Sequence, residues 1–298
     1  MNKVCFVVLI GIPGAGKTTF CERFQQIMLE KYSMVKVVHV CFDKFIRIGD
    51  NLDLETGHMK KKRKQLLRIL EKVVEGIKLK NRIEIEEAND ELTREFNENI
   101  HLDLDHKEKI YSLFLDDNMY YRSMRYEILA LARKHRTGFL QLHFNVSLME
   151  AKARNSERSN PIPEDTMSRM WIKLEKPNGH FYRWEKNTVD LLGNNNLDDL
   201  ETVEQRIIQC TNSPECPIEQ NEVREPVEQS TIHKVDLLLR KAVSDVIKHQ
   251  KALLNGADLK LFTKQLVCKR KAILNDLKLG LIDVDPQCAT KEQIELLF

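Results

Sequence analysis

The sequence predicts an α/β fold, in which a parallel β-sheet flanked by helices is followed by a small C-terminal α-helical domain. Three observations support this prediction. Four short apolar runs alternate with longer helical patterns over the first 190 residues, as in a parallel sheet with crossover helices. A glycine-rich loop follows the first run, and an acidic stretch precedes two amphipathic helical patterns. The 298 residues suffice for about two such domains.

The four apolar runs have the length and composition of buried strands and cover residues 4–10, 35–41, 111–115 and 138–144. A helical pattern follows the first run, and a longer one covers residues 57–81. The latter contains the basic run "KKKRK" at residues 60–64. This run resembles a nuclear-import or RNA-contact patch, and the alternative is a solvated helix end. Residues 81–110 combine strong charge with weak periodicity, so their role stays open.

The glycine-rich loop "GIPGAGKT" (residues 11–18) matches the pattern GxxxxGK[ST] in full, and it lies between a predicted strand and a predicted helix. The glycines permit backbone turns that a Cβ would obstruct, so that N–H groups converge on phosphate oxygens. The predicted nucleotide-binding residues are Gly11, Ile12, Pro13, Gly14, Ala15, Gly16, Lys17, Thr18 and Thr19.

Three side chains of this loop have different predicted roles. We expect Lys17 to reach the β- and γ-phosphates and the Thr18 hydroxyl to bind Mg²⁺. Thr19 caps or supports the helix. The sequence therefore predicts a P-loop that binds a nucleoside triphosphate, expected to be ATP, together with Mg²⁺.

The third apolar run ends on two aspartates in "SLFLDDNMYYRSMRYE". A carboxylate at this place beside a P-loop serves the metal, and Asp116 is the first candidate. Asp117 contacts substrate or caps the next helix, and both aspartates could be helix caps. The aromatic and cationic side chains that follow are expected to line the crevice beyond the strands, or else to pack within their helix: Tyr120, Tyr121, Arg122 and Arg125.

Two further groups complete the predicted site. Asp43 follows the second run, where it could accept a proton from an attacking hydroxyl. The alternative is an ordinary strand-end or helix-capping aspartate. Arg154 and Arg158 are four residues apart, so a helix would place both on one face. There they would neutralise charge on the transferring phosphoryl group, unless they are a solvated pair. "SNPIPED" then breaks the helix, which predicts a lid near residues 150–165. The predicted catalytic residues are Lys17, Asp43, Arg154 and Arg158.

The charge of the chain is unevenly distributed. Residues 1–190 carry 33 Lys and Arg against 28 Asp and Glu, residues 191–230 carry 2 against 9, and residues 231–298 carry 12 against 8. We therefore expect a kinase-like domain over 1–190, an acidic flexible linker over 191–230 and a helical domain over 231–298. Two basic bodies permit a nucleic-acid partner without requiring one.

The cysteines and the hydropathy indicate the compartment. Seven cysteines are scattered without CxxC spacing, and Cys210 and Cys216 lie in "CTNSPEC", where we expect a loop. This pattern is typical of a reducing compartment, so a cytoplasmic protein is expected. The first apolar run continues into the glycine loop without a cleavage site, which disfavours a signal peptide. The apolar runs are also too short to span a membrane.

With these motifs the chain resembles the L-seryl-tRNA(Sec) kinase family. The resemblance rests on "GIPGAGKT", "LDDNMYYRSMRYE", the RxxxR of "RNSER", "KLEKPN" and "IHKVDLLLRKAVS". It implies transfer of the ATP γ-phosphoryl group to a seryl hydroxyl on tRNA, with a C-terminal helical domain that grips the tRNA. It further implies that Asp43 is the base or positions the hydroxyl, that Asp116 serves the metal and that Arg154 and Arg158 are lid arginines. Lys44 departs from relatives that have a second acid there.

Other functions remain open. The main alternative is an accessory ATPase that binds tRNA without phosphorylating it, as in the Elongator-associated relative of this family. A small-molecule kinase would explain the first 190 residues but not the basic helical tail. A structural or RNA-binding module with a vestigial nucleotide site is the least favoured alternative. The sequence does not decide between a monomer and a homodimer.

Overall fold

The computed structural model describes residues 2–46, 56–100, 102, 104, 109–192, 197–217, 231–250 and 256–278. The chain divides into two compact units. The first comprises residues 1–162 and 176–225, and the second comprises residues 163–175 and 226–298.

The first unit is built on a five-stranded parallel sheet with the strand order β2-β3-β1-β4-β5. The strands are β1 (Lys3–Ile10), β2 (Val35–Cys41), β3 (Ile110–Asp116), β4 (Gly138–Phe144) and β5 (Thr188–Leu191). The predicted α/β fold and its four predicted strands, β1 to β4, are thereby confirmed. The sequence missed β5 because this edge strand has only four residues and precedes a Gly-Asn stretch typical of a loop.

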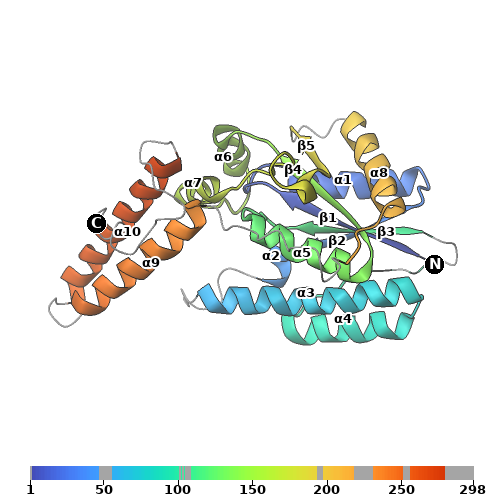
Figure 1. Ribbon diagram of the computed structural model, residues 1–298, viewed down its shortest axis with the longest axis horizontal. Coiled ribbons are helices and arrows are strands. Elements are labelled where there is room, and N and C mark those ends of the chain that lie inside the picture. Colours follow the sequence, from blue (N-terminus) through green and yellow to red (C-terminus); the bar gives the residue numbers. More distant parts are fainter. Residues whose placement is uncertain are drawn as a thin grey trace. The chain divides into compact units, whose positions relative to one another are not determined.

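Helices cover both faces of the sheet (Figure 1). On one face lie α1 (Lys17–Glu30) and α8 (Leu197–Asn212), and on the other α3 (Thr56–Leu79) and α5 (Arg122–His135). Residues 81–110, which gave no prediction, contain α4 (Arg82–Phe96), and α4 packs along α3. Three shorter helices complete this unit: α2 (Phe42–Phe45), α6 (Leu148–Ser156) and η1 (Arg183–Glu185).

Aromatic packing fixes α1 against the sheet and so fixes the end of the glycine loop. Phe20 and Phe24 lie one turn apart on α1 and are almost fully buried. The Phe20 ring contacts Phe144 of β4 at 5.6 Å between centroids, and the Phe24 ring contacts Phe114 of β3 at 5.2 Å. Each such ring buries a large apolar area, so the first turn of α1 is held at the carboxyl ends of the strands.

Helix α8 corrects the predicted linker. Residues 197–212 form a helix whose Leu200, Val203 and Ile207 are buried against the sheet. The prediction of a flexible tether over 191–230 was therefore wrong for these residues, because an acidic outer face conceals an apolar inner face. Cys210, expected in a loop, is buried in this helix, whereas Cys216 is exposed. Residues 218–230 lie outside the described part of the chain.

The second unit contains three helices in its described residues: α7 (Glu164–Lys173), α9 (Thr231–Gln250) and α10 (Gly256–Lys278). The apolar side chains of Met167, Val235, Leu239, Ile273 and Leu274 are buried within it. The two tail helices are therefore where the sequence placed them. Helix α7 had been assigned to residues 1–190, but its buried contacts are made in the second unit. Residues 279–298 lie outside the described part of the chain.

Among the described residues, the helices are all too short or too polar to cross a membrane.

Candidate active site

The glycine loop connects β1 to α1 at the carboxyl edge of the sheet. Gly11, Ile12, Pro13, Gly14 and Ala15 are buried. Gly14 and Gly16 have φ values of +81° and +93°, a region that strongly favours glycine. A Cβ at Gly14 would lie 2.2 Å from the carbonyl oxygen of Ala151 in α6. Only glycine therefore fits this close approach, and the loop has the backbone that a phosphate cradle needs.

Lys17 begins α1 and is buried beneath the loop. Its Nζ donates hydrogen bonds to the carbonyl oxygens of Gly11 and Ile12, at 2.9 and 3.1 Å, and to Asn118 Oδ1 at 3.1 Å. Burial lowers the pKa of Lys17, although three nearby aspartates oppose the shift. A cation held by neutral acceptors at this place is available for phosphate oxygens.

Thr18 and Asp116, which were predicted to serve the metal, lie together. Thr18 Oγ1 donates a hydrogen bond to Asp116 Oδ2 at 2.7 Å, and His39 Nε2 is 3.1 Å from the same oxygen. Burial alone would raise the pKa of Asp116, but the contacts with His39, Lys17 and Thr18 outweigh it and the pKa is lowered. Asp116 is thus a carboxylate at neutral pH. A hydroxyl and a carboxylate are ligands that suit Mg²⁺. Thr18 and Thr19 are both exposed on the first turn of α1.

Asp43 lies in the short helix α2, directly after β2. Burial raises the pKa of this carboxyl group, and the charges of Asp117 and Asp116 raise it further. Lys17 and Arg158 act in the opposite direction. The charges that act on the Asp43 pKa belong to Lys17, Asp116, Asp117 and Arg158, so its role in the site stays a prediction from the shared edge of parallel strands.

The two lid arginines occupy different settings. Arg154 is in the last turn of α6, and its Nη2 donates to Glu150 Oε1 at 2.6 Å. Helix α6 ends at Ser156, so Arg158 lies beyond the helix, and the expectation that one helix would place both on one face was wrong. The polypeptide turns there because Asn155 is buried and bonds to the backbone of Ile162 in both directions. Arg158 nevertheless acts electrostatically on Lys17 and Asp43.

Asp117 has a different environment from Asp116. Its Oδ1 accepts a hydrogen bond from the Asn118 backbone N–H at 2.7 Å, and its Oδ2 forms an ion pair with Arg63 of α3. The Arg63 guanidinium also lies over the Phe42 ring, 4.9 Å from its centroid. Arg63 belongs to the "KKKRK" run, so this residue joins α3 to the edge of the site.

The arginines of "YYRSMRYE" are not at the surface. Arg125 is fully buried, and its Nη2 donates to Glu185 Oε1 at 2.6 Å. Arg125 Nη1 donates to the carbonyl oxygen of Met119 at 3.1 Å. Arg122 lies over the Tyr182 ring, 3.9 Å from its centroid. Arg125 therefore braces the loop after β3, and Arg122 packs against Tyr182. Of the two alternatives for these arginines, packing within the fold holds and lining a crevice does not.

Sequence reasoning missed three contributors: His39 beside Asp116, Asn118 beside Lys17 and Arg63 beside Asp117. Asn118 could have been found, since it directly follows the paired aspartates. His39 could also have been found. Side chains two residues apart on a strand face the same side of the sheet, so His39 faces the same side as Cys41 on β2. The position of Arg63 carried no such signal.

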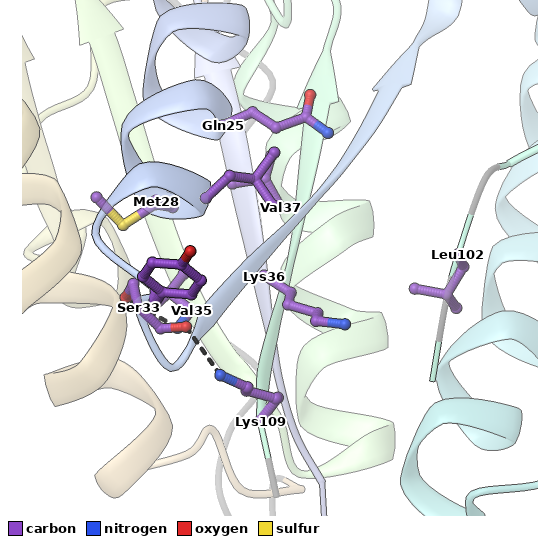
Figure 2. A pocket seen from close by; sticks show the side chains of 10 residues that line it. Gln25, Met28, Ser33, Val35, Lys36, Val37, Leu102 and Lys109 are labelled. Carbon is purple, nitrogen blue, oxygen red and sulfur yellow. Dashed lines mark hydrogen bonds between the residues drawn. The ribbon is translucent and has the colours of Figure 1, made fainter. Parts of the chain in front are cut away.

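A cavity of about 330 Å³ lies away from this site, at the amino-terminal end of β2. Figure 2 shows its lining side chains, which come from the end of α1, the start of β2 and the segment before β3. Lys109 Nζ donates to the Ser33 carbonyl oxygen at 3.0 Å beside it. Because ligands of α/β sheets bind at the carboxyl ends of strands, this cavity is not part of the candidate active site.

The parallel sheet, the glycine loop and the Asp116 carboxylate, which accepts a hydrogen bond from Thr18 at the end of β3, define a P-loop protein of the α/β class. The chain belongs to the family described as "Chromatin associated protein KTI12", whose sequence model matches residues 4–281.

Relatives from mouse, human and an archaeon carry the name L-seryl-tRNA(Sec) kinase. The protein from Mus musculus is 34% identical over 177 residues, which cover 56% of this chain and 49% of that protein. The chain thus spans about half the length of this relative. The protein from Methanococcus maripaludis is 27% identical over 274 residues, covering 91% of this chain and 89% of that protein. The resemblance to this kinase family that the motifs predicted is confirmed.

A solved structure of Kti12 from Chaetomium thermophilum in complex with ADP-AlF3 is similar at a TM-score of 0.46 and 16% identity. The similarity covers 69% of this chain and 98% of that one.

Proposed function

We propose that this chain is an ATP-dependent kinase that phosphorylates the seryl hydroxyl of seryl-tRNA(Sec), giving O-phosphoseryl-tRNA(Sec). The names of the mouse and archaeal relatives support the substrate. The observation that carries the proposal is the convergence of Lys17, Thr18, Asp43 and Asp116 at one edge of the sheet. A phosphate cradle, a metal-binding pair and a free carboxylate beside it are the parts that phosphoryl transfer requires.

The residues divide the work as follows. Main-chain N–H groups of the loop between Gly14 and Lys17 and the positive end of α1 hold the β- and γ-phosphates. Lys17 exchanges its carbonyl acceptors for phosphate oxygens. Thr18 and Asp116 would hold Mg²⁺, which would neutralise phosphate charge. Arg158, and Arg154 after release from Glu150, stabilise charge on the transferring group.

Asp43 orients the attacking seryl hydroxyl. Its raised pKa makes it a better proton acceptor than an ordinary aspartate. Because transition states of phosphoryl transfer are loose, positioning and charge neutralisation should contribute more than proton removal. Replacement of Lys17 should therefore lower turnover more than the Asp43→Asn substitution does.

The second unit offers a surface for the tRNA. Five cationic side chains of the second unit lie near two acids, Asp165 and Asp236, and four of these cations line a cavity of about 110 Å³ between α7 and α10. The cations are Arg169, Lys173, Arg240, Arg270 and Lys271. Burial and the neighbouring Arg240 lower the pKa of Lys173 to about 8. This surplus of positive charge suits the phosphodiester backbone of RNA.

Incubation with ATP labelled at the γ-phosphate and with serylated tRNA tests the proposal. We expect label on the seryl group when selenocysteine tRNA is the substrate. The Lys17→Ala protein is the matched control and should transfer no label. The same assay with serylated serine tRNA measures discrimination between the two RNAs. Label that appears only as free phosphate would overturn the kinase assignment.

That outcome would favour the second candidate, a P-loop ATPase that binds tRNA without phosphorylating it. The specific observation behind this candidate is the match of the KTI12 family model to nearly the whole chain. ATP hydrolysis that depends on tRNA, with an unmodified aminoacyl group, is its expected signature.

A further inference from the structure

Three side chains with different donor atoms meet at the carboxyl ends of β2 and β3. His39 and Cys41 are two residues apart on β2 and so face the same side of the sheet. Asp116 is the register partner of Cys41 on β3 and therefore faces that side as well. The ring nitrogen, the sulfur and a carboxylate oxygen all lie within 4.8 Å of one another.

This donor set differs from the one that Mg²⁺ prefers. Mg²⁺ is bound by oxygen ligands and keeps several waters. A thiolate and an imidazole together with a carboxylate are typical ligands of Zn²⁺, which often has three protein ligands and an open fourth position. Cys41 is a free thiol in an intermediate environment, and the His39 side chain is 15% exposed. An ion can therefore reach the three groups from solvent.

We propose that His39, Cys41 and Asp116 form a second cation site, selective for a thiophilic divalent ion such as Zn²⁺, that competes with Mg²⁺–nucleotide. On binding, the Cys41 thiol proton leaves to solvent and the sulfur, the His39 nitrogen and an Asp116 oxygen coordinate the ion. Small movements suffice, because His39 Nε2 and Asp116 Oδ2 are already 3.1 Å apart.

The competition arises because the two sites share one carboxylate. Asp116 Oδ2 is also the acceptor of the Thr18 hydroxyl. An ion held by Asp116 and β2 would draw the carboxylate away from Thr18, the partner with which it serves Mg²⁺. This half of the inference rests on the proposed role of Asp116 in nucleotide binding. Zn²⁺ should then weaken the binding of Mg²⁺–nucleotide, and Mg²⁺–nucleotide should weaken the binding of Zn²⁺ by the same factor, since such coupling is reciprocal.

The binding half is tested with Co²⁺ alone, added to the nucleotide-free full-length protein. We expect one equivalent to produce a thiolate-to-cobalt charge-transfer band, and Zn²⁺ to displace the Co²⁺. Cys41→Ser, which preserves the side-chain shape, should abolish the band and weaken Zn²⁺ binding about 100-fold or more. His39→Gln should weaken it as well and gives a second, independent variant.

The control is a protein with Cys216→Ser and Cys268→Ser, which removes two exposed thiols outside β2 and should keep the band. A band that persists in Cys41→Ser, or that the control protein loses, would overturn the site.

The competition half is tested by measuring Zn²⁺ affinity with and without Mg²⁺ and a non-hydrolysable ATP analogue. We expect weaker Zn²⁺ binding in their presence, and an equal weakening of nucleotide binding by Zn²⁺ that is absent in Cys41→Ser. Independent binding of the two would overturn the competition. Loss of the band in Cys41→Ser together with no transfer of label to tRNA would overturn the proposed reaction alone, so the two failures are distinguishable.

Discussion

Arg63 shows how one residue of a basic run can differ from its neighbours. The Lys60, Lys61 and Lys64 side chains are exposed, whereas the Arg63 side chain is only 12% exposed. Its guanidinium is paired with Asp117, contacts Met119 Sδ and lies over the Phe42 ring. Lys60, Lys61 and Lys64 thus fit the interpretation as a solvated helix end, whereas Arg63 supports the candidate site, which neither interpretation of "KKKRK" predicted.

Replacement of Arg63 by alanine should destabilise the first unit by about 1–3 kcal/mol, because Asp117 would keep a partly buried charge without its partner. The matched Lys64→Ala substitution, on the exposed side of the same turn, should change stability by less than about 0.5 kcal/mol. Urea unfolding of the two proteins measures the difference. Equal midpoints would show that the pair with Asp117 contributes nothing.

The residues of the site differ in how far the sequence could predict them. The phosphate loop was predictable because its chemistry is local: glycines, a lysine and a threonine at fixed spacing after a strand. The ion pairs were not, since Arg63 and Asp117 are 54 positions apart and Arg125 and Glu185 are 60 apart. A charged residue in a sequence does not reveal its partner, so the sequence left open whether Arg122 and Arg125 face a ligand or pack within the fold.

At the scale of elements, α8 carries the clearest lesson. Its apolar residues Leu200, Val203, Ile207 and Cys210 recur at intervals of three and four, which is the period of an amphipathic helix. The excess of acidic residues between them favoured a linker instead. Charge composition is averaged over a whole segment, whereas burial depends on one face of the helix. In such a segment the period of the apolar residues is therefore better evidence for a helix than the net charge is for a linker. The strand β5 was missed for the opposite reason, because four residues hold too little pattern.

Helix α8 should therefore contribute to the stability of the first unit. Ile207 is fully buried, and Ile207→Ala should cost about 2–5 kcal/mol through lost burial and the cavity left behind. Gln205 lies two residues away on the exposed side, and Gln205→Ala should change stability by less than about 0.5 kcal/mol. Thermal unfolding followed by circular dichroism measures both. If Ile207→Ala unfolds like the parent protein, α8 does not pack as the structure shows.

At the scale of the whole molecule, the chain enters the second unit twice. Residues 163–175 contribute α7, the chain returns to the first unit, and α9 and α10 follow after residue 226. Removal of residues 231–298 would therefore expose Met167 and Leu174, which are buried at present. Single substitutions in the full chain are the sounder way to examine RNA binding by this unit.

Lys173 provides such a test because its pKa is about 8. Burial and the neighbouring Arg240 lower this pKa from the ordinary value for lysine, and Asp236 partly opposes the shift. A lysine with a lowered pKa loses its charge as the pH rises through that value. Between pH 7 and pH 9 the second unit should thus lose one positive charge. The affinity for uncharged tRNA should fall, and the slope of log affinity against log salt should decrease by about 0.7–0.9 if Lys173 neutralises one phosphate.

The matched variants are Lys173→Arg, which keeps its charge at both pH values, and Lys173→Gln, which has none. Lys173→Arg should bind tRNA with nearly the same salt dependence at pH 7 and pH 9, and Lys173→Gln should resemble the parent protein at pH 9 throughout. Fluorescence anisotropy with labelled tRNA over a salt series measures the slopes. Titration of the RNA itself would affect every variant equally. If Lys173→Arg shows the same pH effect as the parent protein, Lys173 is not the source of that effect. This support for RNA binding at the α7–α10 cavity would then be lost.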